Sequence, residues 1–205
     1  MTAGQNGGII KAESDTVAQE EQRYGRNKDT LVNKTYVDSG EYKRKFDNMT
    51  DNPAVNKSLY DCAKKVLKHR SGTLYEDMYW IDGDTGKIIL GITDSTEERG
   101  IPYSDRIMEA IKGKNNIITI HTHPGSMPPS AEDFNLNFDY NYSLGVVACH
   151  NGKLFVYKSD GEISKTLYNL YIGDFEAEGL NEYEAQIATL EKLKENHDID
   201  FWEVF

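Results

Sequence analysis

Residues 116–133 constrain the fold more than any other part of the chain, because they change from strand to bend to helix in quick succession. Residues 116–120 contain three isoleucines and favour a short buried strand that leads directly into His121. Residues 124–129 hold three prolines and one glycine, so they cannot form regular structure. Ser130 can then cap a helix through its hydroxyl. The chain must therefore fold back here and bring a helix start close to a strand end.

Helical and strand patterns alternate on both sides of this run. Asn52 and Pro53 suit a helix start, and Asn151-Gly152 suits the tight turn of a hairpin. Helices are predicted at residues 53–69, at 104–112, from Ser130 onward and at 176–195. Strands are predicted at residues 74–82, 87–92, 116–120, 144–150 and 153–158. This order predicts a mixed β-sheet flanked by helices, in the α/β or α+β class.

The chain is expected to divide into three parts. Residues 1–40 are rich in Gly, Gln, Asn, Thr and charged side chains without a sustained apolar period, which predicts a flexible N-terminal tail or linker. Residues 41–165 are expected to form the folded domain. Residues 166–205 are expected to form a C-terminal helical extension that packs on it.

The balance of charge argues against nucleic acid as a partner. With 34 acidic and 23 basic residues the net charge is −11, so a phosphate backbone would be repelled. The densest basic run, at residues 64–70, is expected to be a solvated helix face. No segment approaches the run of about 20 apolar residues that a membrane helix needs, and the N-terminus lacks the apolar part of a secretory signal. We therefore expect a cytoplasmic protein that does not enter a membrane.

The two cysteines, Cys62 and Cys149, are expected to be buried thiols. They lie far apart and outside any Cys-x-x-Cys pair, which excludes a cysteine-based zinc site. A nucleophilic pair of Cys149 and His150 is disfavoured, because adjacent residues of a strand point to opposite faces. Histidines 69, 150 and 197 are expected to be surface or core residues rather than metal ligands.

His121 and His123 are the strongest candidates for metal ligands. Residues i and i+2 of a strand share a face, so both imidazoles can reach one ion. Asp133, in the first turn of the next helix, can be brought back to them by the proline-rich bend. Two histidines and one carboxylate leave a fourth position open, which is typical of a catalytic zinc site. Zinc lowers the pKa of water from about 15.7 to about 7 and so supplies a nucleophile at neutral pH.

A hydrolytic site of this kind also needs a general base and a donor for the oxyanion. Glu76 is the candidate base, because it lies in an apolar segment where an ionised side chain is costly. Asp77 is its rival, but it occupies the opposite strand face and is a candidate for a solvent-facing residue. Ser130, three residues before Asp133, is the candidate donor, and its alternative role is that of a helix cap alone.

Residues 121–133 read HTHPGSMPPSAED, which resembles the motif of the JAB1/MPN/JAMM zinc metallopeptidases: His-x-His-Pro, then Ser-x-x-Asp, with a glutamate on an earlier strand. The resemblance covers about residues 54–158 and implies the cytidine-deaminase-like fold of that family. It assigns zinc to His121, His123 and Asp133. It also assigns acid/base catalysis to Glu76 and stabilisation of the intermediate to Ser130. The segment LKHRSGTLYEDMYWID is similar to such domains attached to phage minor head proteins.

The resemblance implies hydrolysis of a peptide or isopeptide bond in a protein or peptide substrate, ubiquitin-like proteins included. Only residues 134–141 separate the motif from the next predicted strand, which leaves little room for the insertion that lets some eukaryotic members grip a ubiquitin chain. Two noncatalytic alternatives stay open. The chain could be a structural module of a phage particle or other assembly, tethered by its N-terminal tail, or a module that binds a ubiquitin-like tail without cutting it.

Overall fold

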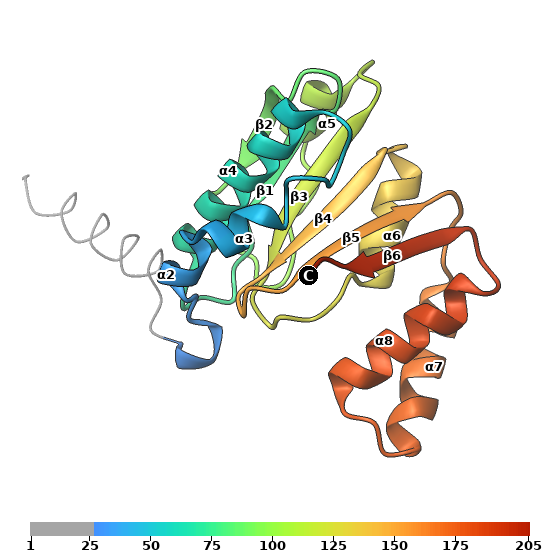
Figure 1. Ribbon diagram of the computed structural model, residues 1–205. Helices are drawn as coiled ribbons and strands as arrows, with labels where there is room; N and C mark the ends of the chain where they lie inside the picture. Colours follow the sequence, from blue (N-terminus) through green and yellow to red (C-terminus); the bar gives the residue numbers. More distant parts are fainter. Residues whose placement is uncertain (1–26) are drawn as a thin grey trace, which may run out of the picture.

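The computed structural model describes residues 27–205, and they form a mixed α/β fold around a six-stranded sheet in the order β2-β1-β3-β4-β5-β6 (Figure 1). The strands are β1 (Met78–Asp82), β2 (Ile88–Ile92), β3 (Ile117–His123), β4 (Leu144–Cys149), β5 (Leu154–Ser159) and β6 (Ile199–Glu203). β3 and β4 run parallel, whereas the other neighbouring pairs are antiparallel. The mixed sheet with helices agrees with the predicted fold class.

Helices cover both faces of the sheet. They are η1 (Lys28–Thr30), α2 (Lys34–Val37), α3 (Gly40–Arg44), α4 (Pro53–Arg70), α5 (Asp105–Ile111), α6 (Ala131–Asp139), α7 (Lys165–Ala177) and α8 (Glu182–Lys194). One core cluster joins α4 to residues of β1, β3, β4 and β5 on one face. Clusters that include α5, α6 and α8 lie on the opposite face. The alternation of side chains along β3 therefore decides which residues face α4 and which face α6.

The long helix α4 forms as its sequence predicts. The side chain of Asn52 accepts a hydrogen bond from the Ala54 N–H at 2.9 Å, and Pro53 occupies the first turn. Its apolar stripe is fully buried against the sheet and comprises Val55, Leu59, Cys62, Ala63, Val66 and Leu67. Gly72, with a φ of 79°, turns the chain after the helix end.

Three regions differ from the sequence prediction. Residues 27–40, predicted as part of the tail, pack on the fold, because Val32 and Val37 enter the α4 core and Val32 N–H donates to Ser71 Oγ at 3.0 Å. The rest of the predicted tail, residues 1–26, lies outside the described residues. The basic run at residues 64–70 is solvated only in part: Lys64 and Lys68 pair with Asp38, but Arg70 is buried.

The C-terminal residues also differ from the single long helix predicted at 176–195. Gly179, with a φ of 102°, separates α7 from α8, and Asn181 caps the second helix. β6 was not predicted, yet it completes the sheet by pairing with β5. Its signal is a short period-2 pattern in which Ile199 and Phe201 are buried while Asp200 and Trp202 are exposed.

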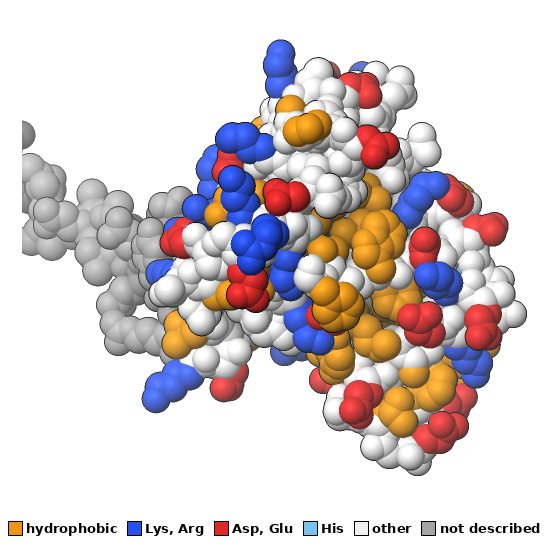
Figure 2. Space-filling view, viewed as in Figure 1, with side chains coloured by type: hydrophobic (Ala, Val, Ile, Leu, Met, Phe, Trp, Pro, Cys, Tyr) orange, Lys and Arg blue, Asp and Glu red, His pale blue; other side chains and the backbone are white. Residues whose placement is uncertain are grey.

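The surface carries its charges unevenly. Figure 2 shows Lys and Arg side chains gathered over the side of α3 and α4, whereas acidic side chains predominate over α7 and α8. Hydrophobic side chains gather near the C-terminus, where Trp202 and Phe205 are exposed. Within residues 27–205, the helices are too short or too polar to cross a bilayer.

Gly145→Ala is expected to destabilise the fold. An added Cβ would lie 2.1 Å from Tyr157 Cζ on the neighbouring strand β5, so the buried aromatic ring would have to shift from its packed position. Overpacking of this kind costs about 1–3 kcal/mol of the free energy of unfolding, which urea denaturation would measure. Gly173→Ala is the matched control: beyond the backbone of its own helix α7, the added Cβ would meet no atom of residues 27–205 within 4 Å, so the unfolding free energy should stay equal or rise.

Candidate metal centre

The two motif histidines lie at the end of β3 and converge. Thr119, His121 and His123 share the face of β3 that looks toward α6, while Ile118 and Ile120 on the other face enter the α4 core. The Nε2 atoms of His121 and His123 are 3.0 Å apart. The strand geometry therefore brings the two imidazoles to one point, as their spacing predicts.

Asp133 reaches the same point from the first turn of α6. Its Oδ1 lies 3.1 Å from His121 Nε2, and its Oδ2 lies 3.4 Å from His123 Nε2. The turn is fixed by a capping box, in which Asp133 N–H donates to Ser130 Oγ at 3.3 Å and Ser130 N–H donates to Asp133 Oδ2 at 2.7 Å. The helix start thus holds the carboxylate in front of the imidazoles.

Glu76 approaches from the segment just before β1. Its carboxylate and the ring nitrogens of His121 and His123 offer ligand atoms that all lie within 4.8 Å of one another. Glu76 is buried, so its carboxylate faces the imidazoles rather than bulk water. Two carboxylates, Glu76 and Asp133, therefore flank one pair of histidines, and either could contact an ion held there.

Ser130 lies in the same site, but its hydroxyl is engaged. Ser130 Oγ donates to Asp133 Oδ2 at 2.8 Å and accepts from the Asp133 N–H. The alternative role of Ser130 as a helix cap is thus present in the structure. A role as oxyanion donor requires its single hydroxyl proton to move from Asp133 to a substrate oxygen.

The second nitrogen of His123 fixes which tautomer faces the site. His123 Nδ1 lies 2.9 Å from the backbone oxygen of Met127, and a carbonyl only accepts hydrogen bonds. Nδ1 therefore carries the hydrogen, and the lone pair of a neutral imidazole sits on Nε2, which points at His121 and Asp133. A backbone carbonyl that orients a histidine in this way is common behind metal ligands. The donor set of two imidazoles and carboxylates fits a divalent ion such as zinc.

The electrostatics of the site favour a cation. Burial opposes the charged form of His123, but the hydrogen bond and charge of Asp133, together with Glu76, outweigh it and raise its pKa to about 9. Burial also opposes the charged form of Asp133, yet the two histidines hold its pKa well below the usual range. Burial raises the pKa of Glu76, and the histidines offset this only in part. The two carboxylates thus stabilise positive charge between the imidazoles.

All five of these residues line one cavity of about 420 Å³. Its other walls come from residues 97–103, which follow β2, and from aromatic side chains beyond the histidines, namely Tyr142 and Tyr157. Residues 97–103 could not be placed here from the sequence, because their position rests on contacts between separate segments, such as the bridge between Tyr75 and Glu98 and the hydrogen bond from Arg99 N–H to Leu74 O at 3.0 Å.

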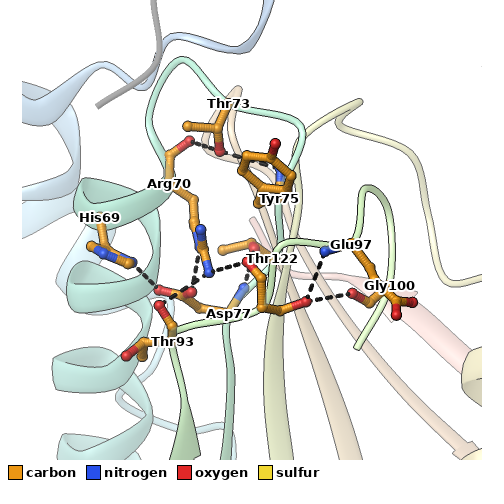
Figure 3. A network of polar contacts seen from close by, with 10 residues as sticks. His69, Arg70, Thr73, Tyr75, Asp77, Thr93, Glu97, Gly100 and Thr122 are labelled. Atoms are coloured by element: carbon orange, nitrogen blue, oxygen red, sulfur yellow. Dashed lines mark hydrogen bonds and ion pairs between the residues drawn. The ribbon is translucent and has the colours of Figure 1, made fainter. Parts of the chain in front are cut away.

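The interpretation of Asp77 as a solvent-facing residue is wrong, because its side chain is fully buried. Figure 3 shows its carboxylate between His69 and Arg70 at the end of α4. Adjacent residues of an extended segment point to opposite faces, so Asp77 faces α4 while Glu76 faces the cavity. His69 Nδ1 lies 2.6 Å from Asp77 Oδ2, and Arg70 Nε donates to Oδ1. The Asp77 carboxylate can be buried among apolar residues because each of its two oxygens has a polar partner.

Cys149 and His150 point apart, as predicted. Cys149 Sγ lies 3.4 Å from Met127 O, whereas His150 Nδ1 donates to Thr30 O at 2.7 Å. Burial raises the pKa of the Cys149 thiol far above its usual value, so a thiolate nucleophile is disfavoured. Cys62 is also buried in a core cluster.

His150 should make the fold sensitive to acid. Burial lowers its pKa to about 4, only partly opposed by its hydrogen bond to Thr30, whereas the unfolded chain takes up that proton near pH 6.5. Between these values the unfolded state binds more protons, so stability falls as the pH drops from 6.5 through 4, by about 3 kcal/mol in total. His150→Gln keeps a hydrogen-bond donor but does not titrate. Urea unfolding at pH 7 and pH 4 should show a smaller loss in that variant than in the wild type, and an equal loss would contradict this origin.

Compared with protein-family models, with curated proteins and with solved structures, the chain gives no match in any of the three. The grouping of Glu76, His121 and His123 as side chains that could hold a metal ion thus stands on geometry alone.

Proposed function

We propose that the chain is a zinc-dependent peptidase or isopeptidase of the JAMM type that its motif resembles. The observation that carries this proposal is the convergence of His121 and His123 with Asp133 in a cavity whose edge holds a buried carboxylate, Glu76. A binding site for a metal alone would not require a buried acid beside the ligands. The arrangement supports hydrolysis rather than a purely structural ion.

His121, His123 and Asp133 would hold the ion. Imidazole nitrogen and carboxylate oxygen are the ligands that catalytic zinc prefers, and three protein ligands leave one position open. When bound, the ion would supply Lewis acidity toward a carbonyl oxygen and toward water. Glu76 and Ser130 line the cavity beside these ligands, and neither is assigned as a metal ligand.

Glu76 would move the protons. Burial raises the pKa of its carboxyl group, which brings it closer to neutral pH than an exposed glutamate and suits a group that must both accept and release a proton. Its carboxylate would take a proton from the attacking water. The same carboxyl would then give that proton to the nitrogen of the leaving amine. Because Glu76 is buried, bulk water is kept from exchanging protons with its carboxyl group during this transfer.

Ser130 would hold the oxyanion. Its hydroxyl stands at the start of α6 and shares the cavity with the histidines. It would turn its proton from Asp133 to the substrate oxygen as negative charge develops there, while its backbone N–H continues to hold Asp133. Positions at a helix start also favour negative charge.

The test is elemental analysis of the purified full chain, paired with cleavage of a peptide library with and without a chelator. The proposal expects about one equivalent of zinc per chain and cleavage that stops on chelation and returns with added zinc. A noncatalytic module of an assembly would leave every peptide intact. A ubiquitin-like protein whose tail binds to the chain but stays uncut would identify a binding module instead.

A further inference from the structure

The regular pairing of β1 with β3 ends just before the catalytic site. The last register pair within β1 is Met78 with His121. At the next step, Thr122 N–H still donates to Asp77 O at 3.2 Å, but Asp77 N–H donates to the side-chain Oγ1 of Thr122 at 3.1 Å. A regular antiparallel pair would exchange two backbone bonds here. A threonine hydroxyl therefore replaces a backbone carbonyl at the position next to Glu76.

Thr122 stands between the two histidines in sequence but faces away from them. It is fully buried on the α4 face, whereas His121 and His123 face the cavity. Asp77 likewise faces α4 while Glu76 faces the cavity. The Thr122–Asp77 link thus joins the ligand strand to the base segment from behind, without touching an ion or a substrate.

The carboxylate of Asp77 ties this link to α4 (Figure 3). His69 and Arg70, the last two residues of that helix, hold both of its oxygens. Neither Asp77 nor Arg70 is open to solvent. Burying such a pair costs desolvation of both charges, and an apolar pair of similar volume would often give equal stability. What the ion pair adds is a fixed direction for the chain at Asp77.

Arg70 also holds the cavity wall. Its Nη2 atom donates to Thr93 O at 3.1 Å (Figure 3) and also to Ser95 O at 3.0 Å. These carbonyls begin the segment that runs into residues 97–103 along the cavity. One guanidinium group therefore sets both the base segment and the start of the wall.

We propose that Thr122, Asp77 and Arg70 are positioning residues that hold the Glu76 carboxylate over the metal ligands; this inference rests on the proposed function. Where β1 and β3 lose their regular pairing, the backbone alone would leave Glu76 free to shift. The hydroxyl of Thr122 and the guanidinium of Arg70 remove that freedom. A displacement of about 1 Å at a catalytic group can cost about a hundredfold in rate.

The matched variants are Thr122→Val and Thr122→Ser in the full chain loaded with zinc. Valine keeps the shape but leaves the Asp77 N–H without an acceptor, whereas serine keeps the hydroxyl. We expect Thr122→Val to bind zinc as the wild type does and to keep KM, but to lose about a hundredfold in kcat. Thr122→Ser should restore most of kcat. Equal kcat for the valine and serine variants, both folded and zinc-loaded, would overturn the inference.

A second measurement separates this inference from the proposed function. Hydrogen exchange of the Asp77 amide should be faster in Thr122→Val than in Thr122→Ser, with exchange in α6 unchanged. If the wild type cleaves nothing, the proposed function fails, and this exchange difference still decides whether Thr122 holds the base segment. Equal exchange in the two variants would show that it does not.

Arg70→Lys tests whether Arg70 positions the start of the cavity wall. Lysine keeps the positive charge beside Asp77 but lacks the second arm that reaches Thr93 and Ser95. We expect KM to rise because the wall at residues 97–103 loosens, and zinc content to stay unchanged. A KM equal to that of the wild type would show that Arg70 does not position residues 97–103 for substrate binding.

Discussion

Glu76→Gln is expected to abolish turnover while zinc stays bound. Glutamine has the size and shape of glutamate, so the buried site should keep its packing, but an amide cannot accept the proton of the attacking water. General-base catalysis contributes about a hundredfold to ten-thousandfold, and kcat should fall by at least that much. Peptide cleavage and zinc content, measured on the same preparation, check both halves of the expectation.

The same variant decides between two roles for Glu76, because its carboxylate lies close enough to the imidazoles to act as a ligand. If it is the base, zinc content is unchanged in Glu76→Gln; if it is a ligand, zinc is lost along with turnover. Glu76→Asp is the matched control, since it keeps a proton acceptor one methylene further away and should retain more activity than the glutamine variant. Full activity in Glu76→Gln would show that the base lies elsewhere.

His123→Ala is expected to lose the metal. The imidazole is one of three proposed ligands, and its removal also takes away one of the two histidines that lie beside Asp133. Loss of an outer-shell partner alone weakens metal binding by about tenfold to a hundredfold, so loss of a ligand should exceed that. Zinc titration followed by elemental analysis measures the effect.

The control for this loss is His197→Gln, because His197 follows α8 and belongs to neither the cavity nor the group of potential ligands. Its zinc affinity should match that of the wild type. The His123→Ala protein should stay folded, since the side chain of His123 is partly exposed and makes no core cluster. Wild-type zinc affinity in His123→Ala would remove this histidine from the site.

The convergence of the three proposed ligands, His121, His123 and Asp133, was predictable because local rules place them. Residues i and i+2 of a strand share a face, which suffices for His121 and His123, and a proline-rich bend followed by a capping serine brings Asp133 back to them. The strand, bend and helix start occur where the sequence predicts them. Short-range geometry thus carried the prediction of which side chains meet.

The parts that sequence did not reveal depend on partners distant in the chain. From the sequence alone Asp77 cannot be told from an exposed carboxylate, because its partners His69 and Arg70 are brought to it only by the packing of α4 on the sheet. β6 is short and becomes a strand only because β5 offers a free edge. Residues 27–40 are polar in composition, and the two valines that anchor them gain meaning only from the α4 core. In each case tertiary contact overrides a weak local preference.

Diffraction from crystals of the zinc-loaded full chain, collected at the zinc absorption edge, tests the central claim most directly. We expect one anomalous peak, about 2.0–2.2 Å from the Nε2 atoms of His121 and His123 and from an oxygen of Asp133. The Glu76 carboxylate should stand beside that peak without displacing its open position. Imidazoles that point apart, or a zinc ion bound elsewhere while this cavity holds only water, would contradict it.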